Sequence, residues 1–77
     1  MRVSRFARYA AAYNNRGFAY ADQRKFDKAI SDYNEAIRLN PNLAIAYNNR
    51  GIAYRRVGDH NKAHSDFATA KRLRAGQ

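Results

Sequence analysis

The chain has 77 residues, of which 15 are Lys or Arg and 6 are Asp or Glu, so its formal net charge is +9. A chain of this length forms at most one small domain with a marginal core, and the absence of cysteine excludes disulfides, thiol catalysis and cysteine-containing metal sites. The excess of positive charge favours acidic partners, a class that includes nucleic acid, anionic lipid and acidic peptides.

The first nine residues match no other part of the chain, and we interpret residues 1–9 as an N-terminal extension. Ser4 is a residue type that caps helices, because its hydroxyl can accept a hydrogen bond from a free backbone N–H group in the first turn. The sequence after it predicts one helix that continues without a break to about Gln23. The extension is therefore expected to form the beginning of the first helix.

No membrane segment is expected. No stretch approaches the roughly 18 consecutive apolar residues that a membrane-spanning helix needs. Arginines at positions 2, 5 and 8 leave no apolar run longer than two residues in residues 1–9, so no signal peptide is recognised there. We expect a cytoplasmic protein without a membrane partner.

Residues 10–43 and 44–77 are two copies of one 34-residue unit. The copies are identical at 16 of 34 positions without a gap, and the block Tyr13–Gly17 recurs unchanged as Tyr47–Gly51. A fixed period of this length indicates a repeat architecture, in which each unit buries its apolar face against the next. The second copy includes a short C-terminal tail.

Small and aromatic residues recur in each copy at spacings of three and four, which places them on one face of a helix. Each copy therefore predicts an antiparallel helical hairpin. Glycine and alanine are expected where the helix axes approach to about 8–10 Å, and the aromatic rings are expected to fill the flanking gaps. The residues expected in this repeat packing are Tyr13, Gly17, Tyr20, Ala29, Tyr33, Ala36 and Pro41 in the first copy and Tyr47, Gly51, Tyr54, Ala63, Phe67 and Ala70 in the second.

Helix ends are marked in the second copy. Asn42 predicts the N-cap of a helix that ends at Val57, and Asp59 predicts the N-cap of the following helix. Gly58, between them, is expected to adopt the left-handed conformation that often stops a helix. In the first copy Arg24 stands at the position of Gly58, so the first turn is expected to be tighter or more strained.

On these residues the sequence resembles the tetratricopeptide repeat family. The hairpin of that family has an aromatic residue, Gly or Ala, Tyr, Ala, a second aromatic residue, Ala and Pro at the positions given above. The first copy matches all seven positions and the second matches six, because Ala75 stands where the terminal proline would be. Arg16 and Arg50 occupy a position where the family often has leucine. The resemblance implies an all-α fold of two helix-turn-helix hairpins, stacked as a short right-handed α-solenoid.

The resemblance also implies a concave groove, lined by the first helix of each hairpin, that holds an extended peptide. Asparagine suits such a groove because its amide offers both a donor and an acceptor to a peptide backbone. Asn15 and Asn49 are the best single candidates, and Arg55 and Arg56 could bind an acidic side chain or a C-terminus. We therefore expect a non-enzymatic protein-interaction module that prefers acidic or C-terminal peptides. The expected groove residues are Asn14, Asn15, Phe18, Asp22, Asn48, Asn49, Ile52, Arg55 and Arg56.

Two alternatives remain for these groove residues. The Tyr-Asn-Asn-Arg-Gly block could serve packing and hydrogen bonding between the repeats instead of ligand binding. Arg55 and Arg56 could be a solvated basic surface. The family's carboxylate-binding members also place Lys or Arg one turn before the asparagines, where this chain has Ala11 and Ile45.

Self-association is a second hypothesis for the function. Repeat ends without a capping helix could pair with another copy of the chain, which would then act as a homo-oligomeric or domain-swapped scaffold. The surfaces expected to take part are Phe26, Ile30, Ile37, His60, His64 and Phe67.

Nucleic-acid binding is a third hypothesis, supported by basic residues near both chain ends. It is disfavoured because the tyrosines fall on the core face and no RNA-binding motif occurs. These basic residues are Arg2, Arg5, Arg8, Lys71, Arg72 and Arg74.

The sequence gives no sign of a catalytic or metal site. No serine is paired with a base, no glycine-rich phosphate loop occurs, and no carboxylates are paired, so we expect no enzymatic activity, cofactor or metal. His60 and His64 have a spacing that fits one metal ion but lack an evident third ligand. Because their repeat equivalents are Phe26 and Ile30, we expect a partly buried face whose packing weakens near pH 5.

Overall fold

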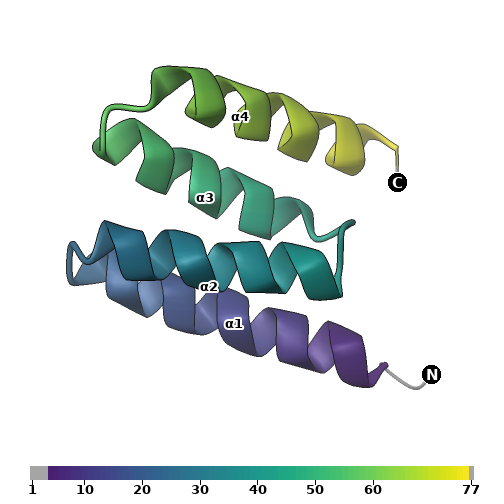
Figure 1. Cartoon of the computed structure of the whole chain (residues 1–77). Helices are drawn as coiled ribbons and strands as arrows, with labels where there is room; N and C mark the ends of the chain where they lie inside the picture. Colours follow the sequence, from purple (N-terminus) through teal and green to yellow (C-terminus); the bar gives the residue numbers. More distant parts are fainter. Residues whose placement is uncertain (1–3, 77) are drawn as a thin grey trace.

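The computed structural model describes residues 4–76. Within this range the chain forms four α-helices and no strand, so the expected all-α fold is confirmed. Figure 1 shows α2, α3 and α4 stacked in succession, with α1 beside α2 at one end of the stack and both chain ends on the same side. Of the residues discussed above, Arg2 and Gln77 lie outside the described residues. The helices are α1 (Arg5–Asp22), α2 (Phe26–Leu39), α3 (Ala44–Arg56) and α4 (His60–Ala75).

The first helix begins and ends close to the expected positions. The Ser4 side chain accepts a hydrogen bond from the backbone N–H of Ala7 at 3.0 Å, and α1 ends at Asp22. The following turn contains Arg24 at a φ of 64°, a left-handed value that is uncommon outside glycine. Gly58 adopts a φ of 89° at the same position of the second hairpin. The first turn is thus more strained than the second, as predicted.

The beginning of α3 differs from the prediction, whereas the beginning of α4 agrees with it. Asn42 is not a helix cap, because the turn that includes it delays the helix until Ala44. The backbone N–H of Asn42 instead donates to Oδ1 of Asn40 at 3.2 Å, which stabilises that turn. Asp59 accepts a hydrogen bond from the backbone N–H of Lys62 and caps α4 as expected.

Each hairpin is held together by an aromatic ring that lies on a glycine. A Cβ atom built on Gly17 would lie 2.7 Å from Cε1 of Tyr33, and one built on Gly51 would lie 2.8 Å from Cε1 of Phe67. Only glycine allows the ring and the opposite helix to approach this closely. Pro41 does not take part in this packing, because it lies exposed in the turn between α2 and α3.

The other expected packing residues lie at the helix contacts. Four alanines, two in each hairpin, are buried, and four tyrosines are half-buried between the helices and the solvent. The alanines are Ala29, Ala36, Ala63 and Ala70, and the tyrosines are Tyr13, Tyr20, Tyr47 and Tyr54.

The two hairpins join where α2 packs against α3. Ala29 and Tyr33 of α2 form a buried cluster with Ala53 of α3, and Phe26 and Ile30 pack against this cluster. The expectation that Phe26 and Ile30 lie on a free end surface is therefore wrong, since the second repeat covers them.

The two histidines occupy a different environment from their repeat equivalents. His60 and His64 are exposed on α4, on the side that no other described helix covers. The expected partly buried histidine face is therefore wrong, and with it the reason for weaker packing near pH 5 is lost.

Candidate functional site

The same repeat positions of α1 and α3 form a surface that we call the α1–α3 face. Its two apolar members, Phe18 and Ile52, are separated by one repeat length and are 60% and 37% exposed. Large apolar side chains that recur at an exposed position of two neighbouring helices favour contact with a partner. The α1–α3 face consists of Asn15, Phe18, Asp22, Asn49, Ile52, Arg55 and Arg56.

The four asparagines of the repeated block lie in different environments. Asn14 is buried, and its Oδ1 accepts a hydrogen bond from Nδ2 of Asn49 at 3.2 Å. This bond joins α1 to α3 and is the kind of inter-repeat contact considered above. Asn15 is exposed, whereas Asn48 and Asn49 are half-buried. The complete amide of Asn15 and the carbonyl oxygen of Asn49 therefore remain for a ligand.

Two arginines stand at the end of the α1–α3 face near the turns. The guanidinium carbon of Arg55 lies 5.4 Å from the ring centre of Phe67, and that of Arg56 lies 5.3 Å from the ring centre of Phe26. These rings hold the two cations in place through their negative faces. Within residues 4–76 neither arginine has an acidic partner, so both charges are available to an anionic group.

A pair of part-buried ionic contacts, not predicted from the sequence, fixes the helices carrying this face. Nε and Nη2 of Arg16 each donate to the carboxylate of Asp32 at 2.7 Å. Arg50 donates to Asp66 in the same bidentate way at 2.8 and 2.7 Å. The sequence held a signal for both, because Arg and Asp recur sixteen residues apart in each copy.

Aromatic rings complete each of these ionic contacts. The guanidinium carbon of Arg16 lies 5.5 Å from the ring centre of Tyr13 and 5.9 Å from that of Tyr20. The hydrogen bonds to Asp32 and its charge raise the pKa of Arg16, so the side chain stays charged. The arginine and the carboxylate therefore join the first and second helix of each hairpin in place of apolar packing.

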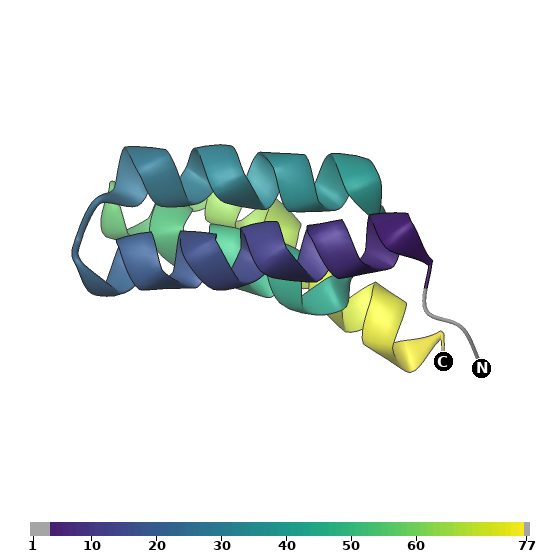
Figure 2. The same ribbon diagram turned by 90° about the horizontal axis from the view of Figure 1, so that it is seen from below.

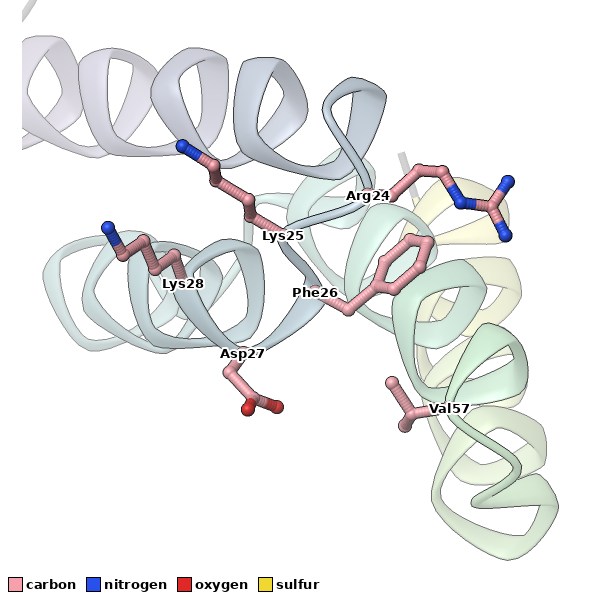
Figure 3. A pocket seen from close by; sticks show the side chains of 6 residues that line it. All are labelled: Arg24, Lys25, Phe26, Asp27, Lys28 and Val57. Carbon is pink, nitrogen blue, oxygen red and sulfur yellow. The ribbon is translucent and has the colours of Figure 1, made fainter.

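A hollow of about 450 Å³ lies at the turn between α1 and α2, and Val57 at the end of α3 also lines it. Figure 3 shows Arg24, Phe26 and Val57 on one side of the start of α2, while Lys25 and Lys28 extend away from them. Because its charged groups do not point toward one another, this hollow does not gather the groups that would bind a ligand in a defined position.

The described residues contain neither a metal-binding cluster nor a membrane-spanning helix. Between residues 4 and 76, no three side chains of His, Cys, Asp or Glu come together as a metal ion would need. None of the described helices is both long enough and apolar enough to cross a membrane.

The fold and the repeated contacts define a helical-repeat protein, and sequence comparison identifies the family. Two tetratricopeptide repeat profiles match the chain, one at residues 10–43 and one at residues 32–65. The chain belongs to the tetratricopeptide repeat (TPR) family. A comparison with curated protein sequences gives no match.

Solved structures with the same fold include two that are similar over most of this chain. One, described as "First TPR of Spaghetti (RPAP3) bound to HSP90 peptide SRMEEVD", has a TM-score of 0.85 and 30% identity, and the match covers 87% of this chain and 53% of that one. The other, MamA, has a TM-score of 0.84 and 32% identity, with coverage of 88% and 40%. The chain thus spans about half of the first structure and two fifths of the second.

Proposed function

We propose that this chain is a non-enzymatic protein-interaction module whose α1–α3 face binds an extended peptide with acidic side chains or a free C-terminus. The observation that carries the proposal is the recurrence of an exposed apolar side chain, Phe18 and Ile52, on both helices of this face. The RPAP3 repeat domain, which binds an acidic HSP90 peptide, supports the peptide class of partner.

The chemistry of the face fits such a ligand in three ways. Phe18 and Ile52 provide apolar contact for side chains of the peptide. Asn15 and Asn49 provide amide groups for its backbone. Arg55 and Arg56 provide charge-assisted hydrogen bonds to carboxylates, and the net charge of +9 favours association with an acidic segment.

The test is a titration of the chain with the labelled peptide SRMEEVD, measured by fluorescence anisotropy. Control peptides carry an amidated C-terminus, or glutamine in place of both glutamates, so that the two kinds of carboxylate are separated. We expect binding that weakens with each control peptide. Arg55→Gln and Phe18→Ser are each expected to weaken binding about tenfold, which corresponds to about 1.4 kcal/mol.

Asn61→Ala, an exposed asparagine on α4, serves as the matched control and should leave the affinity unchanged. Equal affinity for all variants, or no binding of any peptide, would contradict the proposal. Nucleic-acid binding would be recognised instead by an affinity for duplex DNA that falls with salt at a slope of about −0.9 per phosphate contact on a logarithmic scale.

A further inference from the structure

A second surface of α1 is distinct from the α1–α3 face. We call it the outer face of α1, and it consists of Tyr9, Ala12, Arg16 and Ala19. These residues are three and four positions apart and so share one side of the helix. Tyr9 lies nine residues before Phe18, which is 2.5 turns, so the two point in opposite directions. Figure 2 shows α1 in the foreground, with α3 and α4 on its far side.

The equivalent positions of α3 are covered by a helix. Ala46 and Ala53 are 0% and 1% exposed, because α2 of the preceding repeat packs over this side of α3. Their counterparts Ala12 and Ala19 are exposed on α1. The side chain of Arg50 is 20% exposed, whereas that of Arg16 is 60% exposed. The outer face of α1 therefore repeats a surface that docks a helix elsewhere in the same chain.

The hydrogen bonds of the two arginines show what such a helix supplies. Nη1 of Arg50 donates to Oδ1 of Asn34 on α2 at 2.9 Å, in addition to the two bonds to Asp66. Arg16 makes the two equivalent bonds to Asp32, but within residues 4–76 its Nη1 donates to no side chain. An amide thus accepts from Nη1 of Arg50 in the second repeat, whereas no described side chain accepts from Nη1 of Arg16 in the first.

We propose that the outer face of α1 docks an amphipathic helix of another protein, and that this helix carries two apolar side chains and an amide at intervals of four residues. This is the chemistry with which α2 covers α3, through Phe26, Ile30 and Asn34. Tyr9, 52% exposed, would extend the apolar contact. Arg5 and Arg8 lie exposed along the same helix, so acidic residues flanking the docked helix would complement the charge.

A second copy of this chain does not provide that helix. Its α2 is already covered by its own α3. Its α4 lacks the two large apolar side chains and the amide, because His60, His64 and Ala68 stand in place of Phe26, Ile30 and Asn34. Pairing of two α1 helices would bring Arg5, Arg8 and Arg16 of both copies together, and like charges in contact oppose association. Because neither pairing of two copies supplies the helix, we assign the occupant to another protein. The proposal concerns another surface than the peptide site and stands without it.

The test uses a helical probe of known sequence. The probe is a peptide with the sequence of residues 25–40, held helical by a staple between positions 28 and 32. In the chain Lys28 and Asp32 face α1, so the staple leaves unchanged the side of the peptide that covers α3. The control peptide has the sequence of residues 59–74, stapled at the equivalent positions 62 and 66. We expect the labelled α2 peptide to bind the intact chain and the α4 peptide to bind at least tenfold more weakly. An Asn34→Ala α2 peptide should also bind less tightly.

Variants of the protein locate the binding surface. Ala12→Arg is compatible with a helix and places a long side chain in the centre of the outer face, so it should weaken binding of the α2 peptide about tenfold. Tyr9→Ser should also weaken binding of the α2 peptide. Phe18→Ser, on the α1–α3 face, should have no effect. Circular dichroism verifies that each variant is folded.

Three outcomes would overturn the proposal. Equal binding of the α2 and α4 peptides would remove the specificity on which it depends. If Ala12→Arg leaves the affinity for the α2 peptide unchanged, the peptide does not bind to the outer face of α1. A concentration-dependent dimer in light scattering, abolished by Ala12→Arg, would make a second copy the occupant instead of another protein.

Discussion

At the scale of single residues, Arg24 has the least favourable backbone conformation in the described chain. It is the one non-glycine residue with a positive φ among residues 4–76. A left-handed conformation costs an L-residue roughly 1–2 kcal/mol, because Cβ crowds the following carbonyl oxygen. The second repeat avoids this cost by using Gly58 at the same position.

Replacement of this arginine should therefore stabilise the protein. We expect Arg24→Gly to raise the free energy of unfolding by about 0.5–1 kcal/mol, since relief of strain exceeds the additional entropy of glycine in the unfolded chain. Gly58→Ala is the reciprocal control and should lower stability by about 1 kcal/mol, although no side chain lies within 4 Å of its position. Urea denaturation measures both, and a loss of stability in Arg24→Gly would show that the side chain contributes more than its backbone strain costs.

A second residue, Tyr33, gives stability a dependence on alkaline pH. Burial, together with the nearby charge of Asp32, raises the pKa of Tyr33 to about 12 from an ordinary value of 10.0. The folded protein thus holds this proton more tightly than the unfolded chain does. The corresponding stabilisation is complete below pH 10 and is lost as pH rises from 10 to 12.

The variant Tyr33→Phe isolates this effect. Phenylalanine is tolerated because Phe67 occupies the equivalent position of the second repeat. Between pH 9 and 12 the wild-type protein should lose about 2–3 kcal/mol more of its free energy of unfolding than the variant does. Denaturant titrations at several pH values provide the measurement, and parallel curves for the two proteins would contradict the assigned pKa.

At the scale of helices, the two Arg–Asp pairs are alike in geometry but differ in their surroundings. Both carboxylates are buried, with side chains 7% exposed, whereas Arg50 is far more covered than Arg16. α2 accounts for the difference, because it lies over Arg50 and contributes the Asn34 amide. A buried charge that loses its partner cannot recover full hydration, so the loss should matter more in the second hairpin.

We expect Asp66→Asn to destabilise the protein by about 2–3 kcal/mol and Asp32→Asn to destabilise it less. Arg16 can turn to water when its partner is removed, because 60% of its side chain is exposed. Glu35→Gln removes the partner of the exposed Arg38 and should change stability by less than about 0.5 kcal/mol. Thermal unfolding of the three variants tests this order, and equal losses for Asp32→Asn and Asp66→Asn would refute the role given to α2.

Helix ends could be predicted from the sequence where one side chain decides them. Ser4, Gly58 and Asp59 act locally, through a cap or a left-handed residue, and the sequence located all three. The start of α3 could not be located in this way, because Asn42 is held by Asn40 within a turn that competes with capping. Such competition depends on the path of the backbone through Pro41, which a pattern of residue types does not specify.

At the scale of the whole molecule, the period of 34 residues was enough to predict two stacked hairpins. It was not enough to predict which surfaces remain exposed, since a repeat places equivalent residues in unequivalent environments. Phe26 and His60 are an example: the first lies between the repeats and the second faces solvent. Asn14 is another, because it is buried and accepts a hydrogen bond from Asn49, whereas its equivalent Asn48 is half-buried.

The Arg–Asp pairs escaped prediction for a related reason. Each residue is charged and would ordinarily be placed on the surface, and their separation of sixteen exceeds the spacing at which neighbours on one helix meet. Only knowledge that the two helices of a hairpin run antiparallel and in contact brings these positions together. The sequence signal lay in the recurrence of the same pair in both copies.

The polar outward side of α4 has one more consequence. A stack of helices grows when an uncovered helix accepts the next one, and α4 has His60, His64 and Ala68 where α2 presents two apolar groups and an amide to α3. If the outer face of α1 docks a helix as proposed, addition is favoured at the α1 end and opposed at the α4 end. An assembly built on this chain would have a direction, as a polymer does when only one of its ends is reactive.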